Sequence, residues 1–271
     1  MPRLTLAAVT IALVAAAPLA AQFDPDVWLA QCRRNKWNDD RPKYCEVRET
    51  GMRPARGALT VDPGQNGGVA ILGWDKDSIA VTAKIEVQGY SDAEAADLAR
   101  QIRIDASGSS IRATGPAPSG RRQYWSVSFD VYVPRHSDLT LSTENGPLSI
   151  EDVVGTMDLS TENGPLELTA VGGAVKARVQ NGPLGVRLDG AKWEGAGLDA
   201  ETVNGPVDLE IPEGYSARLE TGTVNGPMSV GFPMTVTVQG RITQHLSTVL
   251  GQGGALVHVA TTNGPLTIRR R

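Results

Sequence analysis

The chain has 271 residues and a formal net charge of −4, which argues against broad nucleic-acid binding because that function needs an excess of basic residues. Aromatic residues make up only 5% of the chain, whereas glycine and proline number 30 and 17. This composition suits many short strands joined by tight corners better than a helical bundle. We therefore expect an all-β fold, and the length is compatible with one such domain.

Residues 1–21 have the pattern of a secretory signal peptide. One positive charge, on Arg3, precedes an apolar run over residues 4–17, and small residues follow up to Ala21. The apolar run is too short for a comfortable membrane span. We predict that this segment directs export to the periplasm or the cell exterior, and that the mature chain has no transmembrane span.

Residues 22–56 contain the only two cysteines, Cys32 and Cys45. In an exported chain an isolated pair favours one disulfide, which would hold a small loop or a short helix around residues 24–32. A redox-active pair is the alternative, but the short CxxC spacing that tunes thiolate chemistry is absent. We predict a disulfide-stapled N-terminal segment followed by a β-solenoid domain over residues 57–271.

The tripeptide Asn-Gly-Pro occurs six times in the second half of the chain. The copies are Asn145-Gly146-Pro147, Asn163-Gly164-Pro165, Asn181-Gly182-Pro183, Asn204-Gly205-Pro206, Asn225-Gly226-Pro227 and Asn263-Gly264-Pro265. They stand 18, 18, 23, 21 and 38 residues apart, which is the self-similarity of a repeat array. Because 38 is near twice 19, we expect that one coil before the last copy has lost its marker.

Apolar and polar residues alternate on both sides of each copy. In the first copy Leu139 and Leu141 precede the asparagine, and Leu148 and Ile150 follow it. This period of two indicates strand, corner, strand with one buried face. A tight Asn-Gly hairpin is the alternative, but the proline that follows has no N–H with which to close the turn.

We therefore predict a single-stranded parallel β-helix with coils of about 18–23 residues, in which glycine and asparagine take positive φ angles at the corners. Stacked coils would place equivalent residues in columns about 4.8 Å apart. One column is an amide ladder of Asn145, Asn163 and Asn181. A second column contains the threonines two positions before the asparagines, namely Thr143, Thr161, Thr202, Thr223 and Thr261.

The first half of the domain is expected to be more irregular. We predict a helix over residues 91–102 that Ser91 and Glu94 cap, and a strand over residues 124–134 that leads into the first repeat. Residues 74–78 form a turn between two strands, and Asn66-Gly67-Gly68 fits the corner pattern with glycine in place of proline.

The stretches "NGGVAILGWDKDSIAV" and "VSFDVYVPRHSDLTLSTENGPLSI", with the recurring strand-NG-strand units, resemble the bacterial putative adhesin family, a secreted domain of unknown function. The resemblance covers about residues 57–271. It implies a right-handed parallel β-helix related to adhesin head domains. It supplies no catalytic residues and no cofactor.

Candidate chemistry is sparse. Glu144 and Glu162 should stack one coil apart, near the carboxylate separation of a retaining glycosidase, so a polysaccharide-active lyase or glycosidase is the alternative function. His136, His245 and His258 lack metal-ligand spacing, so we predict no metal site and no cofactor. Residues 269–271, three arginines, are interpreted as a solvated end that discourages strand addition at the open edge.

The first hypothesis from the sequence is an exported, non-catalytic β-solenoid of the cell envelope. It would present a rigid surface to an envelope protein or a glycan and bind no nucleic acid. The Asn-Gly-Pro corners are then structural elements and not a ligand site.

Overall fold

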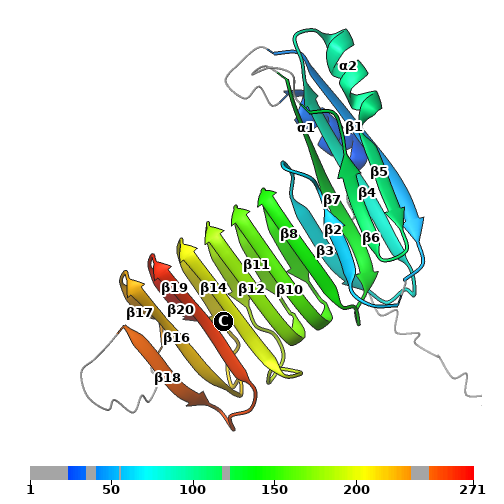
Figure 1. Ribbon diagram of the computed structural model, residues 1–271. Coiled ribbons are helices and arrows are strands. Elements are labelled where there is room, and N and C mark those ends of the chain that lie inside the picture. The colour runs from blue at the N-terminus through cyan, green and yellow to red at the C-terminus, as the bar shows by residue number, and fades with distance from the viewer. Residues whose placement is uncertain (1–23, 35–40, 55, 118–122, 233–243) are drawn as a thin grey trace, which may run out of the picture.

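The computed structural model describes residues 24–34, 41–54, 56–117, 123–232 and 244–271, so the predicted signal peptide lies outside the described residues. Within these ranges the chain forms two helices and two ten-stranded sheets that face each other along a rod (Figure 1). No helix in the described part is both long and apolar enough to cross a membrane.

Each sheet is named here and its strands are given in spatial order. Sheet A consists of β1 (Lys43–Met52), β4 (Ile79–Gln88), β7 (Tyr124–Pro134), β3 (Val69–Trp74), β9 (Leu148–Glu151), β11 (Leu166–Thr169), β13 (Leu184–Arg187), β15 (Val207–Ile211), β20 (Leu266–Arg270) and β17 (Met228–Val230). Sheet B consists of β18 (His245–Leu250), β16 (Ala217–Asn225), β19 (Leu256–Asn263), β14 (Gly197–Asn204), β12 (Gly172–Asn181), β10 (Val154–Asn163), β8 (Leu139–Asn145), β2 (Leu59–Asp62), β6 (Ser110–Thr114) and β5 (Arg103–Ser107).

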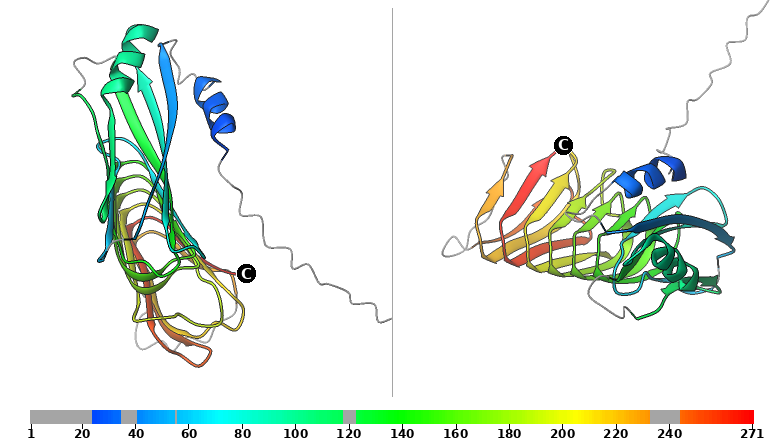
Figure 2. Two further views of the ribbon diagram at one scale, coloured as in Figure 1. Left: turned by 90° about the vertical axis from the view of Figure 1, so that its right-hand side faces the viewer. Right: turned by 90° about the horizontal axis from the view of Figure 1, so that it is seen from above.

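The Asn-Gly-Pro copies join a sheet B strand to a sheet A strand, so each repeat contributes one strand to each sheet (Figure 2). The stacked strands are parallel and in register, with Asn163 opposite both Asn145 and Asn181. The predicted stacking of the repeats is therefore confirmed, and the hairpin alternative is wrong at these corners.

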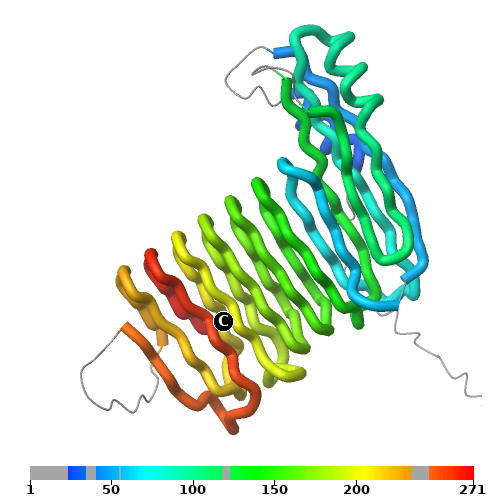
Figure 3. Tube along the Cα trace, in the orientation of Figure 1, coloured from blue at the N-terminus to red at the C-terminus, as the bar shows by residue number. Residues whose placement is uncertain are grey.

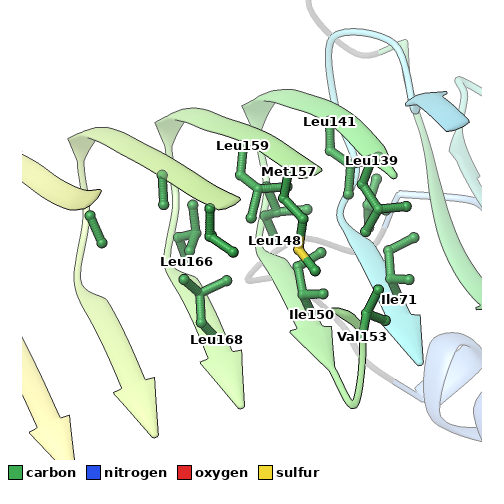
Figure 4. Packing of buried hydrophobic residues seen from close by; sticks show 14 of the residues in the cluster. Ile71, Leu139, Leu141, Leu148, Ile150, Val153, Met157, Leu159, Leu166 and Leu168 are labelled. Carbon is green, nitrogen blue, oxygen red and sulfur yellow. The ribbon is translucent and has the colours of Figure 1, made fainter. Parts of the chain in front are cut away.

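The alternating apolar residues fill the space between the two sheets. Leu139 and Leu141 point inward from sheet B and meet Leu148 and Ile150 from sheet A, and all four are almost completely buried (Figure 4). The same positions of the next repeats continue this core along the rod, because the register repeats. A coil therefore buries its apolar face only when a neighbouring coil extends the core.

The first half of the rod differs from the predicted parallel β-helix because both sheets are mixed. In sheet A, β1 pairs antiparallel with β4, and β4 pairs antiparallel with β7. In sheet B, β5 and β6 form an antiparallel pair. The predicted turn at residues 74–78 reverses the chain, but β7 lies between the two strands that the turn connects. The start of the rod therefore combines antiparallel pairs with parallel ones, since β3 pairs parallel with β7 and β2 pairs parallel with β6.

Two helices lie at this end. Helix α1 (Pro25–Arg34) is joined to β1 by the disulfide between Cys32 and Cys45. Helix α2 (Asp92–Gln101) has the predicted cap, in which the Ser91 hydroxyl accepts a hydrogen bond from the backbone N–H of Glu94. Its alanines at 95 and 99 are buried, so a face of small residues packs on the strands.

The order of the last coils does not follow the sequence. Strands β19 and β20 lie between the pair β14/β15 and the pair β16/β17, although they come later in the chain (Figure 3). The step of 38 residues is therefore not a coil without its marker. Part of it forms β18, which pairs antiparallel with the outer edge of β16.

This insertion also overturns the interpretation of the basic residues 269–271 as an open edge. Strand β20 has β15 on one side and β17 on the other. Arg269 pairs with Asp208 across a distance of 3.0 Å, and the guanidinium of Arg270 lies 4.7 Å from the centre of the Phe232 ring. Arg269 thus joins β20 to β15, and Arg270 contacts a residue just beyond the end of β17.

Candidate functional site: a groove beside the corner ladder

The corners are held by backbone hydrogen bonds that run along the rod. In each coil the N–H of the corner glycine donates to the carbonyl of the next asparagine in the stack, as from Gly146 to Asn163 at 3.0 Å. The residue after proline donates in the same direction, as from Leu148 to the carbonyl of Pro165. The proline therefore costs no hydrogen bond, because its carbonyl is used and its missing N–H is not needed.

The reason for glycine at the corners is close packing. A Cβ atom on Gly182 would lie 2.1 Å from the carbonyl oxygen of Gly164, and a Cβ on Gly205 would lie 1.9 Å from that of Gly182. The predicted positive φ angles are wrong for asparagine, because the described non-glycine residues with positive φ are Asp152 and Ala170. Among the corner glycines, Gly164 and Gly182 have positive φ angles, of 159° and 158°, and the other four do not. The glycines allow the backbones of stacked corners to touch.

The predicted amide ladder is present and is longer than expected. Asn163 donates from Nδ2 to Oδ1 of Asn145 at 3.1 Å, and Asn181 donates to Asn163 at 3.0 Å. The ladder continues through three further copies, by bonds from Asn204 to Asn181, Asn263 to Asn204 and Asn225 to Asn263. The coil of β19 and β20, which we call the inserted coil, is therefore part of the same column.

The predicted threonine column is also present, and its side chains are buried. Their hydroxyls donate mainly to glycine carbonyls of adjacent corners, as from Thr202 to Gly182 and from Thr261 to Gly205, both at 2.9 Å. In the third copy Val179 takes the place of threonine. The column thus fixes the inner side of each corner while the asparagines fix the outer side.

A shallow groove of about 870 Å³ follows the corners along the outer face of sheet B. Its most exposed lining is the row of side chains that immediately precede the asparagines, which we call the corner row. In spatial order these are Glu144, Glu162, Gln180, Val203, Thr262 and Val224. The groove also contains Arg178 and Glu201 from the next outward row. It crosses six strands, so it runs along the rod and not along any one strand.

The two glutamates singled out from the sequence lie together at one end of this groove. Glu144 and Glu162 are both exposed, and their neighbours on either side are in register. Glu144 accepts a hydrogen bond of 3.2 Å from the side-chain amide of Gln65. A catalytic pair needs environments that make one carboxyl group an acid and the other a base, whereas both groups here face solvent.

A polar cluster that the sequence analysis missed lies beside the groove. Arg178 on β12 contacts Asp199 on β14 at 2.7 Å, and Nδ1 of His258 on β19 lies 2.8 Å from the other oxygen of Asp199. Glu201 lies 3.7 Å from both Arg178 and His258. The repeat alignment could have placed Arg178 near Asp199, but the inserted coil brings His258, which its place in the sequence does not reveal.

Asp199, Glu201 and His258 place potential ligand atoms within 4.8 Å of one another. The Arg178 guanidinium occupies one oxygen of Asp199, so a cation would compete with a positive charge already in place. Burial opposes ionisation of Asp199, but the hydrogen bonds from Arg178 and His258 outweigh it and hold its pKa below the usual value. The arrangement is that of an ion-pair network.

The other two predicted histidines take no part in this cluster. His136 forms an isolated bridge with Val154, and His245 begins the edge strand β18. The sites predicted from sequence thus separate into a ladder along every corner, a disulfide at one end of the rod, and two exposed glutamates within the groove.

The fold and the groove define the class of the protein: a two-sheet β-solenoid with antiparallel strands at its start. The family model described as Toastrack DUF4097 matches residues 76–269, and the chain belongs to this family. The resemblance to a bacterial putative adhesin family is confirmed by this match. A search of curated proteins gave no match.

Several solved structures are similar over most of the chain. A putative cell adhesion protein from Clostridium sporogenes has 8% identity and a TM-score of 0.42, with 84% of this chain and 100% of that chain covered. A putative adhesin from Bacteroides fragilis has 12% identity and a TM-score of 0.32, with coverage of 84% and 97%. A putative lipid binding protein from Parabacteroides distasonis has 9% identity and a TM-score of 0.29, with coverage of 84% and 96%.

Proposed function

We propose that this chain is an exported, adhesin-like β-solenoid of the cell envelope that binds a protein or a glycan on its rigid surface and catalyses no reaction. The observation that carries the proposal is the corner ladder with the groove beside it. Hydrogen bonds between stacked asparagines and between stacked corners hold the outward side chains in fixed rows. A surface ordered in advance loses little conformational entropy on binding.

Two further features support the proposed location. The first 21 residues have the composition of an export signal, although they lie outside the described residues. The bond between Cys32 and Cys45 is of a kind that persists in oxidising compartments such as the periplasm and the cell exterior. Fractionation of cells that express the full chain should place it in the periplasm or outside the cell, whereas retention in the cytoplasm with reduced cysteines would contradict the proposal.

The binding function is tested with the purified, oxidised chain. Biolayer interferometry against immobilised envelope proteins and envelope polysaccharides should give saturable binding to at least one of the two classes. The heat-unfolded chain serves as a control for adsorption, because it keeps the composition and loses the surface. Absence of saturable binding to both classes would overturn the proposal.

A polysaccharide-active enzyme is the second candidate, because the register brings Glu144 and Glu162 together within the groove. Its test is a screen for release of reducing ends or unsaturated products from acidic and neutral glycans. Turnover that disappears in Glu144→Gln or Glu162→Gln, with the circular dichroism spectrum unchanged, would favour the enzyme over the binding protein.

A further inference from the structure

The groove has an uneven distribution of charge along its length. Three carboxylates, those of Glu144, Glu162 and Glu201, line it together with one guanidinium, that of Arg178. Arg178 is already engaged by Asp199 at 2.7 Å. Glu144 and Glu162 are the charged lining residues contributed by β8 and β10, whereas Glu201 and Arg178 come from β14 and β12. The end of the groove formed by β8 and β10 is therefore acidic.

The carboxylates of Glu144 and Glu162 contribute little to the fold. Within the described part of the chain, Glu144 accepts hydrogen bonds only from the side-chain amides of Gln65 and Asn145. Among the residues that the structure describes, neither Glu144 nor Glu162 forms an ion pair with a lysine or an arginine. Two exposed carboxylates about one strand spacing apart, such as those of Glu144 and Glu162, repel each other when no cation lies near them. Their arrangement is therefore a cost to the free protein, and a cationic partner would relieve it.

The other end of the groove is apolar. Val203 and Val224 stand in the corner row on β14 and β16, with Thr262 of the inserted coil between them. The exposed fraction of Val203 is 37% and that of Val224 is 67%, so both keep apolar surface in contact with water. Single exposed valines are common, but here two share one row and continue the line of the glutamates.

We propose that this groove binds an extended, basic polypeptide segment of a partner protein, with lysine or arginine side chains over Glu144 and Glu162 and an aliphatic side chain over Val203 and Val224. The inference rests on the proposed binding function and names its partner class. An extended chain lying along the groove presents alternate side chains to one surface, and long basic side chains can adapt to carboxylates that repeat from coil to coil.

A polypeptide fits the groove better than a neutral glycan does. Among the described residues that line the groove there is no aromatic side chain, so these residues offer no ring on which the apolar face of a sugar could stack. Opposite charge across an interface speeds association and selects the partner, and a few apolar contacts then slow dissociation. The acidic end and the valine end of the groove can supply these two contributions.

The test uses a fluorescent probe peptide, Lys-Ser-Lys-Ser-Lys-Ser-Leu-Ser-Leu, and measures its anisotropy with the oxidised full chain. The probe should bind saturably, and its affinity should fall as salt is added because exposed charges are screened. The double variant E144Q/E162Q should raise the Kd about tenfold. A second probe has glutamine in place of each lysine. Its Kd for the wild type should equal the Kd of the lysine probe for E144Q/E162Q.

The matched control also removes two carboxylates from neighbouring strands, but on sheet A and not on the groove face of sheet B. Glu151 and Glu167 extend from β9 and β11 on sheet A, outside the groove, so E151Q/E167Q should leave the Kd within about twofold. The variant V203S/V224S should weaken binding of the leucine-bearing probe about fivefold and should not affect a probe with serine in place of leucine.

Other outcomes separate this inference from the proposed function. Equal losses of peptide affinity in E144Q/E162Q and E151Q/E167Q would overturn the groove as the binding site, because the attraction would then be unspecific. In another outcome, a chitosan oligosaccharide binds more tightly than the peptide and loses this binding in E144Q/E162Q. That result would overturn the polypeptide and identify a cationic glycan as the partner class. Binding of envelope material that persists in E144Q/E162Q, with no peptide binding, would overturn this inference alone. Absence of all binding would overturn both.

Discussion

From β8 onward, the coils of the rod are parallel and in register, apart from the antiparallel edge strand β18, whereas β1, β4 and β7 at the other end of sheet A are antiparallel. The parallel coils repeat one set of contacts: apolar side chains inside, threonines at the inner side of five of the six corners, and asparagines outside. At the antiparallel end a helix, a disulfide and the pair of β5 and β6 replace these contacts. A repeat can stabilise only another repeat, so the end of an array needs different structure.

The largest expected difference between the two regions concerns glycine. In Gly182→Ala the new Cβ would lie 2.1 Å from the backbone oxygen of Gly164, which cannot move without separating the coils. We expect a loss of about 4 kcal/mol or more in the free energy of unfolding, measured by urea denaturation, or a failure to fold.

The matched control lies in β1. A Cβ on Gly51 would have its nearest neighbour, the oxygen of Ile79, at 3.6 Å, which is an ordinary contact. Gly51→Ala should therefore change the free energy of unfolding by no more than about 0.5 kcal/mol. Similar losses in both variants would mean that the corners are no tighter than an edge strand.

The disulfide should matter only at the antiparallel end. The double variant Cys32→Ser and Cys45→Ser should cost up to about 3 kcal/mol, because the bond closes a loop with a sequence separation of 13. In hydrogen exchange, α1 and β1 should lose protection while β10 and β12 keep theirs. A uniform increase in exchange along the rod would contradict this separation of the two regions.

A smaller effect should distinguish the interior of the ladder from its end. Asn181 takes part in two ladder hydrogen bonds, and Asn225 takes part in one. We expect Asn181→Ala to lower the free energy of unfolding by about 2 kcal/mol and Asn225→Ala by about 1 kcal/mol. Equal costs, measured in parallel urea titrations, would show that the side-chain bonds add nothing to the backbone stacking.

The smallest expected difference between the two regions lies in the pH dependence of the free energy of unfolding, and it appears only at alkaline pH. Burial, assisted by the negative charges of Asp189 and Glu194, raises the pKa of Tyr215 to about 12. The unfolded chain ionises this phenol near pH 10, so the folded protein should lose stability as the pH rises from about 10 to about 12.

The variant Tyr215→Phe removes this contribution and should show a smaller fall in the urea midpoint over the same range. Tyr124, at the antiparallel end, also has a raised pKa, chiefly because of burial, but its side chain is more exposed. Tyr124→Phe should therefore change the pH dependence less than Tyr215→Phe does. The reverse order would contradict the assignment of the alkaline loss to Tyr215.

Local pattern was sufficient to predict much of this molecule. Alternation around each Asn-Gly-Pro predicted the buried faces, and the missing N–H of proline argued against the tight hairpin. The same spacing predicted the ladder at Asn145, Asn163 and Asn181. These predictions succeeded because a corner and its neighbour one coil away have nearly the same sequence, so one copy describes the surroundings of the next.

Prediction failed where neighbours are not related by the repeat. The placement of β19 and β20 depends on contacts between distant segments, such as Asn263 with Asn204, and no local signal records it. The cluster of His258 with Asp199 was missed for the same reason. The antiparallel pairing of β1, β4 and β7 likewise depends on which strands meet, whereas the pattern within each strand predicts only its buried face.

The displaced order of the final coils has a consequence for how the molecule forms. The ribosome makes residues 217–230 before residues 256–270, yet the later segment separates the earlier one from the rest of the rod. Growth of the structure cannot simply follow synthesis from coil to coil. The outer pair of strands must wait, or must open again, until the inner pair arrives, so this end should be the slow and reversible step of maturation.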